Sequence, residues 1–189
     1  MSESLAADDA RLAEAARSGD RVAFASLISL HKATLYRLAR GFVGNGDDAY
    51  DILQETFVAA WLSLARFDTS QAFGPWIRTI LLNKCRDHSR RRAVRRKLLQ
   101  WLQLTESEPE ASSPGSTEPT GADDARLSAL EQAVAGLPTR YKEPLLLTAY
   151  QGMSQREAAA QLGLTPKAVE LRIHRARKKL EEQLRRDDA

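Results

Sequence analysis

The stretch that decides the fold is residues 152–180, GMSQREAAAQLGLTPKAVELRIHRARKKL, because it holds the start and stop signals of two consecutive helices. Ser154 is followed three residues later by Glu157. This is the spacing of a capping box, in which the side chain of each residue accepts a hydrogen bond from the other's backbone N–H. The box predicts a helix that begins at Gln155.

The end of this helix and the start of the next are also marked. Gly163 can adopt the left-handed conformation of a tight turn at low cost. Thr165 and Pro166 then provide an N-cap and a first-turn proline for a second helix. Ala159 is small at the point where the two helices must approach each other. Together these signals indicate a helix-turn-helix.

The second helix of this pair has an apolar side and a basic side. Its inward stripe is Val169, Ile173, Ala176 and Leu180, and its outward positions are Lys167, Leu171, His174, Arg175 and Lys178. A basic outer face suits the major groove of DNA. The alternative is an ordinary helical hairpin whose basic face contacts only solvent.

Three more amphipathic helices are predicted upstream. Apolar residues recur at spacings of three and four over residues 24–42, 49–64 and 73–81. The first of these helices ends at Gly44-Asn45-Gly46, a strong turn signal, and Asp47 or Asp48 is expected to cap the second. No stretch of strand length alternates between apolar and polar residues, so the predicted fold class is all-α.

The predicted helix that starts near residue 73 carries an outward face of mixed chemistry. This face is formed by Trp76, Thr79, Asn83, Arg86 and Arg90. An aromatic side chain can stack on an unpaired base, an asparagine can read a base edge, and arginines neutralise phosphates. The combination points to contact with DNA that is being opened. Taken singly, Trp76 and Trp61 are more often core residues, and arginine runs often lie in solvent.

Charge is distributed unevenly along a chain whose net charge is only +3. Residues 84–97 contain eight Lys or Arg and a single acidic residue, whereas residues 105–124 contain six acidic residues and no basic one. Like charges at that density need a polyanion to offset their repulsion. The acidic segment, TESEPEASSPGSTEPTGADD, has almost nothing to bury in a core, so we predict that it is a flexible linker.

Several classes of protein are excluded. The single cysteine, Cys85, rules out an internal disulfide, and the three histidines lack metal-ligand spacing, so we expect no metal and no cofactor. Because no phosphate-binding loop, nucleophile elbow or evident carboxylate pair is found, we do not expect an enzyme. A secretory signal and a run approaching about 20 apolar residues are also missing. We therefore expect a soluble cytoplasmic protein without membrane insertion.

Two segments in a fixed order carry a family resemblance. Residues 47–92, DDAYDILQETFVAAWLSLARFDTSQAFGPWIRTILLNKCRDHSRRR, resemble the second conserved region of extracytoplasmic-function sigma factors, and the helix-turn-helix looks like their fourth region. The resemblance implies a transcription initiation factor that brings core RNA polymerase to promoter DNA. It also implies control by an anti-sigma factor, since no sensory domain is evident.

The resemblance assigns roles to three sets of residues. On the second predicted helix, Asp48, Asp51, Gln54, Glu55 and Phe57 would dock on the clamp helices of the largest polymerase subunit. The flap is the other part of core polymerase that the protein is expected to contact. Recognition of the −10 element would fall to Phe67, Asp68, Phe73, Trp76, Thr79, Asn83, Arg86 and Arg90. Recognition of the −35 element would fall to Lys167, Glu170, Leu171, Arg172, His174, Arg175, Arg177 and Lys178. The acidic linker would run through the polymerase cleft.

Two positions depart from the family pattern. Many relatives have Arg or Lys followed by Ser where this chain has Glu170 and Leu171. Glu170 could accept a hydrogen bond from a cytosine amine, and Leu171 could pack against a thymine methyl group, so the −35 sequence would differ from the common ones. Two other functions stay open: a simple DNA-binding repressor, and a sigma mimic that only titrates an anti-sigma factor.

The expected organisation is two small helical domains joined by a flexible linker. The boundaries are a disordered N-terminus at residues 1–9, a first domain at 10–97, the linker at 98–124, a second domain at 125–184 and a tail at 185–189.

Overall fold

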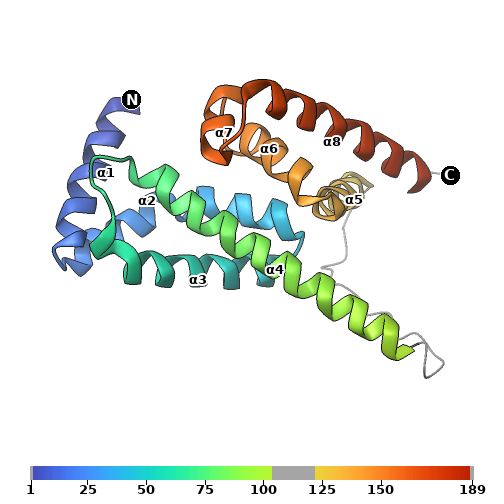
Figure 1. The fold of residues 1–189 in the computed structure, drawn as a ribbon, viewed down its shortest axis with the longest axis horizontal. Helices are drawn as coiled ribbons and strands as arrows, with labels where there is room; N and C mark the ends of the chain where they lie inside the picture. The colour runs from blue at the N-terminus through green and yellow to red at the C-terminus, as the bar shows by residue number, and fades with distance from the viewer. Residues whose placement is uncertain (1, 104–121, 188–189) are drawn as a thin grey trace.

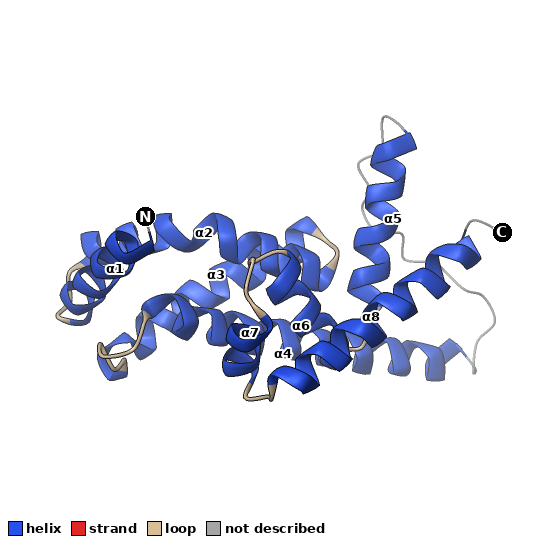
Figure 2. Cartoon of the chain, turned by 90° about the horizontal axis from the view of Figure 1, so that it is seen from above, coloured by secondary structure: helices blue, strands red, loops and turns tan. Residues whose placement is uncertain are grey.

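The computed structural model describes residues 2–103 and 122–187, and these residues are helical apart from short loops (Figures 1 and 2). The first four helices, the N-terminal unit, are α1 (Ser2–Arg17), α2 (Arg21–Val43), α3 (Gly46–Ser63) and α4 (Phe73–Gln103), with a 3-10 turn, η1, at Leu64–Arg66. The C-terminal unit is α5 (Ala122–Gly136), α6 (Thr139–Ala149), α7 (Gln155–Leu162) and α8 (Pro166–Asp187). The all-α prediction is confirmed.

The N-terminal unit is held together by the apolar stripes that the sequence predicts. Leu38 and Phe42 of α2, Leu53 of α3, and Ile77 and Leu81 of α4 are all buried. Burial of each such side chain contributes roughly 1.5–3 kcal/mol, so a few helices of this length suffice for a core. The core fixes α4 by one face and leaves the opposite face for other contacts.

The turn between α2 and α3 differs in one detail from the prediction. Gly44 ends α2 with φ of 76°, as expected for a left-handed C-cap. The N-cap of α3 is Asn45, whose Oδ1 accepts hydrogen bonds from the backbone N–H groups of Asp47 and Asp48. Asp47 and Asp48 already lie inside the helix, so the prediction that one of them caps it is wrong.

Both ends of the N-terminal unit are more helical than expected. Helix α1 begins at Ser2, in place of the disorder predicted for residues 1–9, and Asp9 Oδ2 lies 2.8 Å from His31 Nε2 of α2. Helix α4 continues to Gln103, past the predicted linker start at residue 98, because residues 90–103 consist mostly of Arg, Lys, Leu and Gln, which favour helix. The rest of the predicted acidic linker, up to residue 121, lies outside the described residues.

The C-terminal unit contains the predicted helix-turn-helix. Ser154 and Glu157 form the complete capping box, and Gly163 takes the left-handed conformation with φ of 65°. Thr165 Oγ1 accepts a hydrogen bond from the Ala168 N–H at the start of α8. Helix α5 begins at Ala122, three residues before the expected boundary, and α8 extends through the first three residues of the expected tail.

The two units pack directly on each other, which the sequence did not predict. Helices α5 and α6 contact α2, and α7 contacts the first half of α4 through side-chain hydrogen bonds. Two glycines permit the close approach. A Cβ added at Gly41 would come within 2.9 Å of a Leu146 methyl group, and one at Gly44 within 2.6 Å of the Ala135 Cβ.

Candidate nucleic-acid interface

The mixed face of α4 is present as predicted. Thr79, Asn83 and Arg90 are exposed, while Trp76 and Arg86 are half-buried. All five come from one continuous helix whose opposite face is anchored by buried apolar residues. The sequence therefore brings these residues together as expected, although the C-terminal unit covers part of the face they form.

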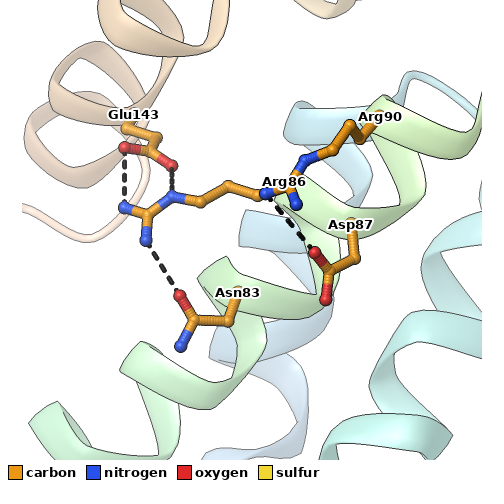
Figure 3. A network of polar contacts seen from close by, with 5 residues as sticks. All are labelled: Asn83, Arg86, Asp87, Arg90 and Glu143. Carbon is orange, nitrogen blue, oxygen red and sulfur yellow. Dashed lines mark hydrogen bonds and ion pairs between the residues drawn. The ribbon is translucent and has the colours of Figure 1, made fainter. Parts of the chain in front are cut away.

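Arg86 is the most constrained member of this face (Figure 3). Its Nη1 donates to Asn83 Oδ1 at 2.9 Å. Its Nε and Nη2 donate to the two carboxylate oxygens of Glu143 in α6, at 2.5 and 2.9 Å. The hydrogen bond to Glu143 raises the pKa of Arg86 above its ordinary value, so the guanidinium is fully charged. Both edges of the guanidinium are thus occupied by protein groups.

An aromatic cluster forms the start of this face. The Trp76 ring centroid lies 4.6 Å from that of Phe67 and 5.4 Å from that of Phe73. Phe67 and Phe73 are only 4% and 1% exposed. Both rings therefore pack against Trp76 in this arrangement, and their predicted contact with the −10 element stays a prediction.

The loop before α4 holds one exposed acidic residue of the predicted set. Asp68 Oδ1 accepts hydrogen bonds from the Ser70 hydroxyl at 2.7 Å and from the Ser70 backbone N–H at 3.0 Å. These bonds, together with one from Gln71, hold the pKa of Asp68 below its usual range. These hydrogen bonds close the loop on itself.

The far half of α4 is the most basic surface among the described residues. Its exposed cations are Arg90, Arg91, Arg92, Arg95, Arg96 and Lys97. Val94, Leu98 and Trp101 lie on the same stretch and are 63%, 54% and 65% exposed. Figure 1 shows this half of the helix extending beyond the neighbouring helices. Its positive charge is therefore available to a polyanion.

The second basic face lies on α8. Val169, Ile173, Ala176 and Leu180 are buried, so the predicted inward stripe is confirmed. The residues expected to read the −35 element are exposed except for Arg172, which is half-buried. A groove of about 620 Å³ lies beside them, lined by residues that include Met153, Glu170, Leu171 and His174.

Glu170 is held in place at the front of this face. Its Oε2 accepts a hydrogen bond from Lys167 Nζ at 3.0 Å, and both side chains are largely exposed. Such an exposed pair is worth little to stability. It does position the carboxylate beside Leu171, at the two places where the chain departs from the family pattern.

Helix α3 presents an acidic and apolar stripe on the surface. Asp51, Glu55, Val58 and Leu62 follow each other at spacings of four, three and four, so they share one helix face. Val58 and Leu62 are 60% and 73% exposed. The sequence-based prediction missed both, although their spacing from Asp51 was a usable signal. Phe57, which it included, is half-buried against the core.

Two negative findings apply to the described part of the chain. It contains no group of three or more His, Cys, Asp or Glu residues that could hold a metal ion. No helix in it is long and apolar enough to cross a lipid bilayer.

Cys85 is fully buried, and burial raises the pKa of its thiol to about 12, so the thiol is protonated at neutral pH.

Comparison with known proteins agrees with this geometry. Family models for sigma-70 region 2 and sigma-70 region 4 match residues 27–95 and 127–180. The chain is 42% identical to the RNA polymerase sigma factor CnrH of Cupriavidus metallidurans and 40% identical to NccH of Alcaligenes xylosoxydans, over 91% of this chain and 92% of each relative. It is 30% identical to the ECF RNA polymerase sigma factor SigM of Mycobacterium tuberculosis, over 91% of this chain and 82% of SigM.

The chain belongs to the extracytoplasmic-function sigma factors of the sigma-70 family. Its α1–α4 unit therefore contains region 2, and its α5–α8 unit contains region 4. Members of this family are transcription factors and not enzymes. The resemblance seen in the sequence is confirmed, and the alternative of a simple DNA-binding repressor is rejected.

Two solved structures are similar over most of this sigma factor. One is CnrH in complex with the cytosolic domain of CnrY, at 39% identity and a TM-score of 0.68, covering 95% of this chain and 99% of that one. The other is RpoE in complex with the anti-sigma factor NepR from Bartonella quintana, at 25% identity and a TM-score of 0.63, covering 86% and 96%. Both similar proteins are sigma factors bound to a partner protein.

Proposed function

We propose that this sigma factor docks on the clamp helices of the largest subunit of core RNA polymerase through the exposed stripe on α3. The observation that carries the proposal is the pairing of acidic and apolar side chains there, Asp51 and Glu55 beside Val58 and Leu62. Exposed apolar residues at this spacing are typical of a helix that packs on a partner helix. Region 4 would dock separately on the flap.

Promoter opening is assigned to the mixed face of α4. Trp76 supplies an aromatic platform, and Asn83 and Arg86 follow it along the helix. Stacking of a base on an aromatic ring is worth about 1–3 kcal/mol, which is comparable to the cost of extruding that base. The basic end of α4 would hold the phosphates of the duplex upstream of the melted −10 element.

Recognition of the −35 element is assigned to the outer face of α8. Lys167, Arg175, Arg177 and Lys178 would contact phosphates or bases in the major groove. Glu170 and Leu171 would favour a cytosine amine and a thymine methyl group. These two residues therefore give this factor a −35 preference of its own.

An anti-sigma factor is proposed as the regulator of this protein in the cytoplasm, where it would meet core polymerase. The support is the similarity to CnrH and RpoE, whose structures contain CnrY and NepR respectively. An anti-sigma protein would act by covering the docking face of α3 or one of the DNA-binding faces.

The opening role is tested with the double variant Trp76→Ala and Asn83→Ala. We expect normal binding to core polymerase and at least about a fivefold loss of open complex, measured by permanganate footprinting, since about 1 kcal/mol or more of stacking is removed. Trp101→Ala is the matched control, because Trp101 is exposed on the same helix but far from the aromatic cluster. An unchanged yield of open complex with the double variant would refute this role.

A further inference from the structure

Helix α1 packs against the part of the N-terminal unit that leads into the mixed face of α4. It contacts η1 and α4 as well as α2. Ala13 and Ala16 on its inner side are only 1% and 2% exposed. The sigma-70 region 2 model starts at residue 27, after the end of α1. A helix outside the matched region therefore touches the segment that we assign to the −10 element.

One polar contact from α1 reaches the aromatic cluster through a histidine. Asp9 Oδ2 lies 2.8 Å from His31 Nε2, and the two side chains are only 14% and 17% exposed. An ionised carboxylate can only accept hydrogen bonds, so Nε2 carries a hydrogen and the direction of the imidazole ring is fixed. The centroid of that ring lies 5.4 Å from the centroid of the Phe73 ring, with the two planes inclined at 46°.

The same imidazole ring also packs on the first turn of α4. A Cβ added at Gly74 would lie 3.4 Å from His31 Cε1, so the ring rests directly on the backbone there. Phe73, the residue before Gly74, packs in turn against Trp76. A chain of contacts therefore runs from Asp9 in α1 to the aromatic platform of the mixed face.

A second contact from α1 reaches the loop that precedes α4. The Glu14 carboxylate accepts hydrogen bonds from Arg17 and from the Thr69 hydroxyl, and these bonds hold the pKa of Glu14 below its usual value. Thr69 is half-buried and lies between Asp68 and Ser70, whose side chains are bonded to each other. The loop is thus attached to itself and to α1.

The side chains of the first contact indicate orientation more than stability. A carboxylate is costly to bury, and an apolar pair of similar size would hold α1 on α2 at least as well. Within the described part of the chain, Asp9 Oδ1 is buried without a hydrogen-bond partner, which adds to that cost. What Asp9 provides is a directional bond that holds the His31 ring against Phe73.

A loop and a ring that are held in place before DNA arrives bind a base at lower cost. Ordering a loop at the moment of binding subtracts from affinity, whereas a loop that is already fixed avoids that loss. The exposed stripe on α3 takes no part in the contacts described above. Loss of a contact from α1 should therefore weaken capture of a base and leave polymerase docking unchanged.

We propose that α1 positions the loop and the aromatic cluster for recognition of the −10 element. Asp9 acts through His31 on Phe73, and a separate contact joins Glu14 to Thr69. Asp9, His31 and Glu14 are positioning residues, because none of them is assigned a contact with DNA. The inference rests on the proposed role of the loop and the aromatic cluster in −10 recognition, and it extends that role to residues of two other helices.

The test uses the full-length protein bound to core polymerase and compares acidic residues of α1. Asp9→Ala removes the acceptor for His31. Glu14→Ala removes the contact with Thr69, and because Glu14 is exposed, the core stays intact. Asp9→Asn is the conservative variant, since its amide oxygen can still accept from the imidazole N–H. Asp8→Ala is the matched control, because it removes the same group one residue earlier, from a side chain that is 54% exposed.

The probe is a fork-junction DNA whose single-stranded arm is first selected from a random pool by the wild-type holoenzyme. Each base of the selected arm is then replaced in turn, and fluorescence anisotropy gives the affinity for every arm. All measurements are made at a temperature where circular dichroism shows each variant to be folded.

We expect Asp9→Ala and Glu14→Ala to bind core polymerase normally and the selected arm about fivefold more weakly. The preference for the selected base over its replacement should fall about threefold at one position or more, because a displaced loop reads a base less well. Asp9→Asn should keep most of this preference, and Asp8→Ala all of it.

The inference is wrong if Asp9→Ala and Glu14→Ala leave both the affinity and the base preference at wild-type values. It is also wrong if they weaken binding to every arm by the same factor, because that is the effect of a helix that only stabilises the fold. Failure of the proposed function looks different. In that case the double variant Trp76→Ala and Asn83→Ala would bind the selected arm as tightly as the wild type does.

Discussion

At the scale of single residues, the buried ammonium group of Lys142 makes the contact between the two units depend on pH. Burial is the main cause that lowers the pKa of Lys142 from the ordinary 10.5 to about 8; the nearby Arg92 acts in the same direction, and Cys85 and Glu143 act in the opposite one. The form in which the two units are packed together therefore binds this proton less tightly than a separated form in which Lys142 is solvated. Packing must release a proton at a pH between the two pKa values.

This linkage predicts that the packed form becomes more favoured as pH rises. Well below pH 8 Lys142 is charged whether the two units are packed together or apart, and its desolvation opposes packing. As pH rises from 7.5 to 9, the packed form loses the proton while the separated form keeps it. We expect the packed-to-separated ratio to rise roughly fivefold to tenfold over that range, measured by energy transfer between dyes on the exposed sites Val58→Cys and Lys179→Cys. Lys142→Met should flatten the dependence. A wild-type ratio that falls over this range would contradict the assignment.

The spacing of residues predicted which side chains share a helix face, but not which distant residues those side chains contact. Spacing placed Trp76, Asn83 and Arg86 on one face of α4, since position on a helix follows from sequence alone. The same reasoning could not show that Arg86 meets Glu143, because 57 residues separate them and no local pattern encodes the contact. Helical spacing also placed Phe73 on the apolar face of α4, whereas the burial of Phe67, which precedes the helix, was not predicted.

At the scale of elements, helix-terminus chemistry explains both the successes and the errors of prediction. The capping box at Ser154 and the turn at Gly163 involve only neighbouring residues, so sequence was sufficient. The sequence-based prediction chose Asp47 or Asp48 as the N-cap of α3 because aspartate is a common cap, and it therefore missed Asn45. Its extended backbone, with φ of −130° and ψ of 137°, makes it the residue that precedes the helix.

The capping box gives a prediction for the stability of region 4. Ser154→Ala removes the acceptor for the Glu157 N–H and should destabilise the protein by about 1 kcal/mol, measured by urea unfolding. Arg156→Ala serves as the control, since Arg156 is exposed and next to the box. Equal unfolding midpoints for the two variants would show that the box does not hold α7.

At the scale of the whole molecule, the three faces to which we assign functions are divided between two helical units. The stripe on α3 faces outward, the mixed face of α4 lies partly under region 4, and the basic face of α8 is exposed. The sequence predicted the two units and their order. It did not predict that they pack together, because the contact depends on Gly41, Gly44 and Lys142, which have no common motif.

The measurement that tests the central claim most directly is binding of the full-length protein to purified core RNA polymerase. We expect a stable complex for the wild type, and at least tenfold weaker binding for Val58→Glu with Leu62→Glu, because two exposed apolar contacts on α3 are replaced by charges. Val22→Glu, at a 75% exposed site on α2, should bind as the wild type does. Wild-type protein that forms no complex with core polymerase would contradict the assignment of α3 as the docking face and, with it, the proposed function.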